Sequence, residues 1–165
     1  MIVHMGGKYD DYMAAKADMR ININIALLSI GFVIFTFIAA IKPDLLRNNI
    51  ILAAELSVSI PFILSSSLAR IKCLRKESCA KWDKFASLTF VVGYGFLISS
   101  IGIMLSVLVL PMISIIFFLI NIILVAVYSF LEISYDDNKA REVGREVLFV
   151  AIIILMGVLP ALGIY

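Results

Sequence analysis

An apolar stretch that runs from Phe85 to Ile133 constrains this sequence more than any other feature. As one straight helix, rising about 1.5 Å per residue, it would be more than about 70 Å long. The hydrocarbon core of a bilayer is only about 30 Å thick. The stretch must therefore fold back, and Pro111, near its middle, disfavours helix at the residue before it. We place two membrane spans here, at about 85–108 and 112–133, joined by a tight turn.

The composition extends this prediction to the whole chain. Of the 165 residues, 62% are hydrophobic and 16% are charged, and the mean hydropathy is +1.07. A soluble domain of this size could not bury so large an apolar surplus. We predict an all-α, polytopic membrane helix bundle with about five transmembrane helices. A cytoplasmic N-terminal segment, 1–20, precedes a single transmembrane domain, 21–165, whose spans lie at about 21–41, 50–71, 85–108, 112–133 and 147–165.

The distribution of charge predicts an orientation. Five spans place the two termini on opposite sides of the membrane. If the N-terminus is inside, only two of the 14 basic residues, Lys42 and Arg47, lie outside. This bias follows the positive-inside rule, so we expect the N-terminus inside and the C-terminus outside. The isoleucine-rich composition and the lack of a signal peptide favour the plasma membrane of a prokaryote.

The most basic segment, 70–84, has six positive and two negative residues. We expect it to attract anionic lipid headgroups. It is short and lacks interleaved aromatic residues, so we expect no nucleic-acid partner. The segment also holds the two cysteines, Cys73 and Cys79, whose spacing matches no usual zinc or redox motif. The sole histidine, His4, is far away in sequence, so we expect no metal and, in a cytosolic loop, free thiols.

Polar and small residues form a stripe along each of the first four spans, at about 100° per residue. We interpret these stripes mainly as faces through which helices pack and hydrogen-bond to one another. The row in span three consists of small residues and is predicted to be a helix-packing face. The stripes are Asn22, Ser29, Thr36 and Ala40 in span one; Glu55, Ser59, Ser66 and Arg70 in span two; Gly95, Ser99, Gly102 and Ser106 in span three; and Ser114, Asn121, Tyr128 and Glu132 in span four.

The charged residue Glu55 stands out, because it lies about five residues inside span two, near Pro61. An ionisable residue within a span is costly and is a candidate for function. The carboxyl group could be protonated, paired with Lys42 or Arg47, or placed along a water-filled path. Pro61 is expected to kink the helix.

The other polar candidates lie deeper or at the inner ends of the spans. Arg70 and Glu132 are both placed at the inner surface, where an ion pair between them is plausible. Asn121 is near the middle of the bilayer and is expected to hydrogen-bond to another helix. The membrane-embedded polar candidates are therefore Glu55, Ser59, Ser66, Arg70, Asn121, Tyr128 and Glu132.

The run Lys16-Ala17-Asp18-Met19-Arg20-Ile21-Asn22-Ile23 leads directly into span one. Residues 16–36 resemble small transmembrane effectors of prokaryotic nucleotide-signalling defence systems. In those proteins a charged helix enters a span through an Ala-Asp-x-Lys/Arg run. The resemblance implies a membrane effector. Because this chain has five predicted spans and no nucleotide-sensing domain, no site residue is carried over.

The sequence contains no catalytic motif that would identify an enzyme. It has no nucleophile elbow, no H-E-x-x-H pattern and no aspartate within a span. Glu132, Asp136 and Asp137 could together bind a divalent cation, but we interpret them as a solvated acidic loop. We therefore expect neither catalysis nor a cofactor.

Two functions remain open. The first is a small, non-enzymatic, self-associating pore, channel-like protein or membrane effector. It would act as a homo-oligomer, because five helices are few for a conducting path within one chain. The alternative is an accessory subunit that packs against other membrane subunits of a larger complex, which the short loops also suit.

Overall fold

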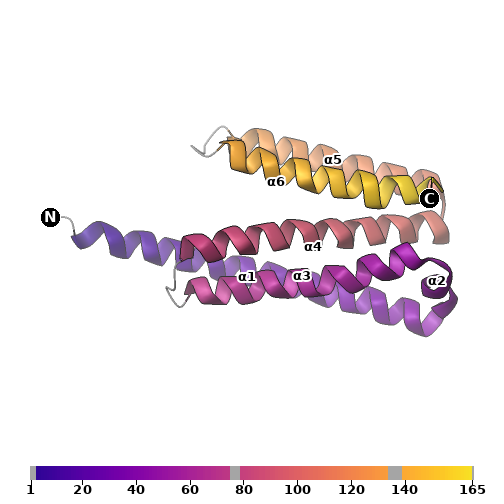
Figure 1. Ribbon diagram of the computed structural model, residues 1–165, viewed down its shortest axis with the longest axis horizontal. Coiled ribbons are helices and arrows are strands. Elements are labelled where there is room, and N and C mark those ends of the chain that lie inside the picture. The colour runs from indigo at the N-terminus through magenta and orange to yellow at the C-terminus, as the bar shows by residue number, and fades with distance from the viewer. Residues whose placement is uncertain (1–2, 75–78, 134–138, 165) are drawn as a thin grey trace.

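The computed structural model describes the backbone of residues 3–74, 79–133 and 139–164, and the side chains of residues 15–74, 81–127 and 143–164. Within these ranges the chain is helical and contains no strand, which confirms the predicted all-α bundle (Figure 1). The elements are α1 (Val3–Ile41), α2 (Pro43–Asn48), α3 (Ile50–Leu74), α4 (Cys79–Leu108), α5 (Pro111–Ile133), α6 (Lys139–Ile152), the π-helix η1 (Ile153–Val158) and α7 (Leu159–Ala161).

Four helical segments are long and apolar enough to cross a membrane. They are Ala15–Ile41, Ile50–Leu74, Lys81–Leu108 and Val143–Ala161, and the apolar part of α5 in the described side chains, 111–127, is shorter. The chain is therefore a multipass membrane protein. The predicted turn at Pro111 is also found, because α4 ends at Leu108 and α5 begins at Pro111.

The short connection between the first two spans is itself ordered by its sequence. Pro43 opens α2 at the first helical position, where a missing backbone N–H costs nothing. Asn49 then caps α3, and its side-chain oxygen accepts a hydrogen bond from the backbone nitrogen of Leu52 at 3.0 Å.

The helix α4 lies at the centre of the bundle, between two groups of helices (Figure 1). On one side it packs with α1 and α3, around a core of apolar side chains. On the other side it packs with α5, α6, η1 and α7, around a second core. The buried residues are Ile38, Leu52, Leu56, Ile63, Leu97 and Ile103 in the first core, and Ile98, Phe118, Phe149, Ile153 and Ala161 in the second.

Glycines let α4 approach both groups closely. A methyl group added at Gly93 would lie 2.9 Å from the backbone nitrogen of Ile63 on α3. On the opposite side, a methyl group at Gly102 would overlap the ring of Phe118, which is fully buried between Gly102 and Gly157. Close backbone approach of this kind is a main source of helix association in lipid, because the hydrophobic effect does not drive helices together there.

The predicted packing row of α4 lies on the second of these faces. A methyl group at Gly95 would lie 3.0 Å from Ile152 of α6. Ser99 is buried beside Gly157, and the hydroxyl of Ser106 donates to the carbonyl oxygen of Ala161 at 3.0 Å. The row Gly95, Ser99, Gly102 and Ser106 therefore joins α4 to the C-terminal helices.

We expect Gly102→Ala to destabilise the bundle by about 1–3 kcal/mol, because the added methyl group must displace the ring of Phe118. Thermal unfolding in a mild detergent measures this change. The matched control is Gly144→Ala, since nothing lies within 4 Å of a methyl group at that position. This control should be stabilised slightly, because alanine favours a helix over glycine. Equal effects at the two positions would contradict the close packing of α4 on α5.

Candidate functional site

The polar row of α3 faces the interior of the bundle. Glu55, Ser59, Ser66 and Arg70 are all buried, with at most 4% of each residue exposed. They share this face with the apolar core residues of α3. Glu55 and Arg70 are 15 positions apart, which is about 22 Å along a helix, so the row carries a charged group near each end of the span.

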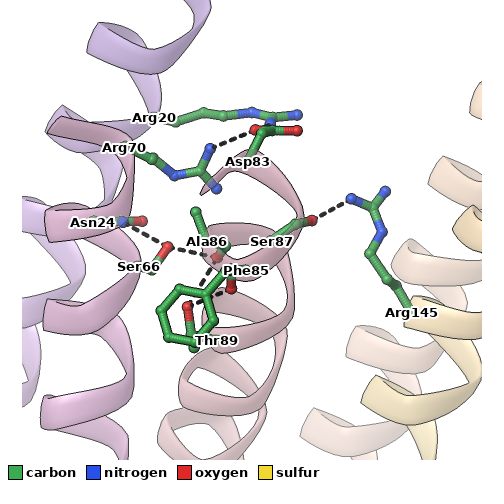
Figure 2. A network of polar contacts seen from close by, with 10 residues as sticks. All are labelled: Arg20, Asn24, Ser66, Arg70, Asp83, Phe85, Ala86, Ser87, Thr89 and Arg145. Carbon is green, nitrogen blue, oxygen red and sulfur yellow. Dashed lines mark hydrogen bonds and ion pairs between the residues drawn. The ribbon is translucent and has the colours of Figure 1, made fainter. Parts of the chain in front are cut away.

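At one end of the row, an aspartate lies between two arginines from different helices (Figure 2). Asp83 of α4 accepts a hydrogen bond from Arg20 of α1 at 3.2 Å. The same carboxylate oxygen lies 3.6 Å from Nη1 of Arg70 on α3. One carboxylate therefore links the three helices of the first group at this end.

The described partner of Arg70 is Asp83. The ion pair that the sequence suggested between Arg70 and Glu132 stays a prediction, because the side chains of Glu132 and Tyr128 lie outside the described residues. Asp83 precedes the apolar part of α4, so hydropathy alone offered no signal that it would meet Arg70.

A chain of hydrogen bonds continues from this cluster into the bundle (Figure 2). The amide of Asn24 on α1 donates to the hydroxyl of Ser66 on α3 at 3.1 Å. Ser66 in turn donates to the carbonyl oxygen of Ala86 on α4 at 2.8 Å, and Thr89 donates to the same oxygen at 3.2 Å. Asn24 is only 1% exposed, so its hydrogen bond to Ser66 lies in the interior of the bundle, between α1 and α3.

The stripe predicted for span one does not pack within the monomer. Asn22, Ser29, Thr36 and Ala40 are exposed on the outside of α1, and the hydroxyl of Ser29 bonds within its own helix, to Ile25. The buried face instead carries a different series spaced by seven residues, which is Ala17, Asn24, Gly31 and Ile38. Both series contain polar and small residues, so the sequence offered no signal that distinguishes them.

In the second group of helices, Arg145 of α6 donates to the hydroxyl of Ser87 on α4 (Figure 2). Ser114 of α5 donates to the carbonyl oxygen of Gly102 at 2.7 Å. Asn121, which was expected to reach another helix, donates to Phe117 of its own helix at 2.8 Å. Of the predicted stripe in span four, Ser114 thus makes the contact between helices.

Glu55 is enclosed at the other end of α3. It is 1% exposed, and neither carboxylate oxygen makes a hydrogen bond within the described residues. The suggested pairing with Lys42 or Arg47 is not found, because no described side chain bonds to the Glu55 oxygens, and Arg47 lies 4.0 Å from Asp44 on its own helix. A buried carboxyl group without a partner costs about 1–3 kcal/mol.

The described residues hold no group of three or more histidine, cysteine, aspartate or glutamate side chains that could bind a metal ion. The free thiol expected at Cys73 is not found, because Cys73 is disulfide-bonded. The side chain of Cys79 lies outside the described residues. The expectation of free thiols rested on the predicted cytosolic side of the loop and on no contact within the fold. The disulfide and the charge bias indicate opposite compartments for the loop.

We expect Asp83→Asn to destabilise the protein by roughly 3 kcal/mol, because it leaves the buried guanidinium of Arg70 without its counter-charge. Asp44→Asn is the matched control, since Asp44 and Arg47 form an exposed pair with side chains about 80% accessible. That control should change stability by less than about 1 kcal/mol. Thermal unfolding of both variants makes the comparison, and similar losses would show that the cluster at Asp83 has no special weight.

We expect Glu55→Met to stabilise the protein by roughly 1–3 kcal/mol, because it replaces a buried polar group without a partner by an apolar one of similar length. Glu55→Gln should give no such gain, since the amide would remain unsatisfied. Denaturation of the purified variants in detergent measures the difference. A loss of stability on Glu55→Met would mean that the carboxyl group has a partner essential to the fold.

Neither a family model, nor a characterised protein, nor a solved structure matches this chain. Its function must therefore be inferred from its own geometry. One feature of that geometry makes no described contact with another helix of the monomer: the polar outer face of α1, with Asn22, Ser29 and Thr36 exposed.

Proposed function

We propose that this chain is a non-enzymatic membrane protein that works as a homo-oligomer, with α1 at the contact between copies. The observation that carries the proposal is the polar outer face of α1. Asn22, Ser29 and Thr36 lie on this face, exposed and directed away from the rest of the bundle. Polar side chains in a span are used for contacts between helices or for water-filled paths.

The geometry of α1 supports a second helix packed against this face. Residues seven positions apart drift by only about 20°, so the three polar residues lie within about 40° of one another. Asn24, on the buried face, lies about 160° away from Asn22 around the helix. In the most apolar window of α1 only 17% of the residues are buried, compared with 44% in α4. The monomer therefore leaves most of α1 uncovered.

The position of the polar residues supports a channel-like oligomer. The interior of the first helix group is filled by Leu52, Leu56 and Leu97, so polar residues accessible to a path are on the outside. From Asn22 to Thr36 the stripe extends about 21 Å, roughly two thirds of the hydrocarbon thickness. Copies of α1 arranged around an axis would line that axis with amide and hydroxyl groups. The charge bias favours an orientation with the N-terminus inside, and the isoleucine-rich composition favours the plasma membrane of a prokaryote.

The second candidate is an accessory subunit of a larger membrane complex. The same face of α1 also exposes the large apolar residues Phe32, Val33 and Phe37, each more than half exposed. A helix of another polypeptide could cover them equally well. The two candidates differ in one observable: whether the neighbour of α1 is a second α1.

We expect Ser29→Cys, in a chain whose native cysteines are replaced by serine, to form a disulfide-linked dimer in native membranes under mild oxidation. The polar face brings two copies of this position together in a symmetric contact. Ile30→Cys is the matched control, because Ile30 is 48% exposed at the same depth but lies about 100° round the helix. Electrophoresis without reductant measures the linked fraction.

A linked fraction at Ser29 no greater than at Ile30 would contradict the homo-oligomer. Cross-linking of Ser29 to a different polypeptide would support the accessory subunit instead. If the dimer forms, ion flux in proteoliposomes tests the pore. Thr36→Leu should then reduce flux, because it makes the stripe apolar. Absence of flux in the parent oligomer would leave a structural or effector assembly and not a channel.

A further inference from the structure

A cavity of about 330 Å³ lies where the two groups of helices face each other, at the end of the bundle that carries the Asp83 cluster. Residues of α1, α3, α4, α5 and α6 line it. Its volume is at the lower end of the range of about 300–1,000 Å³ that is typical of small-molecule sites. It does not include the outer face of α1, so it is independent of the proposed contact between copies.

One end of this cavity is strongly basic. Three arginines from three helices, Arg20, Arg70 and Arg145, line it, together with one acidic residue, Glu146. Asp83 adds a second negative charge next to two of the arginines. Figure 2 shows Arg20 and Arg70 on one side of α4 and Arg145 on the other.

Arg70 retains hydrogen-bonding capacity at this end. It is 4% exposed, and its Nε and Nη1 atoms make no hydrogen bond within the described residues. Its Nη1 is 3.6 Å from Asp83, which is an ion pair without hydrogen-bond geometry. Guanidinium groups bind phosphate and carboxylate oxygens in a fixed, two-pronged geometry. An anion in the cavity would supply the acceptors that these two atoms of Arg70 lack.

The other end of the cavity is apolar and aromatic. Tyr94 stacks between Phe90 and Phe149, with ring centroids 5.7 and 5.5 Å apart and planes within 7° of parallel. From Ser87, at the polar end, to Tyr94 the wall of α4 extends about 10 Å. Val91 and Val125 complete this apolar part. The polarity of the lining thus changes from cationic to apolar along one direction, into the membrane-spanning part of the bundle.

We infer that this cavity binds one anionic amphiphile, with a phosphate or carboxylate headgroup at Arg70 and Arg145 and part of an apolar chain against Tyr94 and Phe149. Free anions would use only the basic end of the cavity, and neutral apolar molecules would leave the buried Nε and Nη1 of Arg70 without acceptors. Only an amphiphile of negative charge matches both ends. Its ordinary source is an anionic phospholipid of the surrounding bilayer, and a free phosphate ester is the other source of the same headgroup chemistry.

The test is native mass spectrometry of the intact chain in a neutral detergent, titrated with three probes. They are phosphatidylglycerol, phosphatidylcholine with the same acyl chains, and glycerol phosphate. We expect one phosphatidylglycerol per chain, with phosphatidylcholine bound at least about tenfold more weakly, because its choline cation adds a positive charge beside the arginines and like charges brought together cost several kcal/mol. Arg145→Gln and Val91→Trp, which fills the apolar half, should each weaken phosphatidylglycerol about tenfold or more.

Lys84→Gln is the matched control, because Lys84 is an exposed cation at the same end of α4. It should change binding by no more than about twofold. If Arg145→Gln fails to fold, Arg145→Lys takes its place, since it keeps the positive charge but removes the two-pronged geometry of the guanidinium group. The inference is overturned if Lys84→Gln weakens binding as much as the arginine variant, because the attraction would then be general surface charge. It is also overturned if phosphatidylcholine binds equally well, or if glycerol phosphate binds as tightly as the lipid.

Discussion

The bundle depends on how closely the backbone of α4 can approach its neighbours. In lipid the hydrophobic effect does not drive one helix against another, so dispersion contacts between close backbones must do so. Gly93 provides this approach toward α3, and Gly102 provides it toward Phe118 on α5. Because the two glycines face opposite groups of helices, α4 joins two packed units that have few other contacts. The cavity lies between these two units, at the end of α4 that carries Asp83.

Polar contacts then determine the relative rotation of the helices that close packing brings together. Asp83 must face both Arg20 and Arg70, and Ser66 must lie between Asn24 and the carbonyl oxygen of Ala86. Apolar packing alone would tolerate a slip of one helix past another. The ion pairs do not tolerate such a slip, because a buried charge that loses its counter-charge costs several kcal/mol. The same cluster that orients α1, α3 and α4 also gives the cavity its basic end.

The helices, the turn at Pro111 and the buried row of α3 could be predicted from the sequence, because each depends on local hydropathy or on a charge inside an apolar run. The buried face of α1 could not. Asn22 and Asn24 each belong to a series spaced by seven residues. Large apolar residues lie on every side of the membrane-spanning part of α1, so hydropathy does not show which series faces the bundle. Arg70 pairs with Asp83, which belongs to a different helix. The amide of Asn121 instead donates a hydrogen bond to Phe117 of its own helix. Competition between local and long-range partners is not visible in a single sequence.

The length of α1 has a mechanical consequence. It is one unbroken helix of 39 residues, from Val3 to Ile41, and is about 58 Å long. That is nearly twice the hydrocarbon thickness, and Figure 1 shows its first turns projecting past the ends of the other helices. Since a continuous helix has no hinge, α1 acts as a lever. A tilt of about 10° within the bilayer, well inside the usual range for membrane helices, would swing its N-terminal end by about 10 Å. A displacement of the Ile41 end of α1 is therefore carried to its Val3 end without any change of secondary structure.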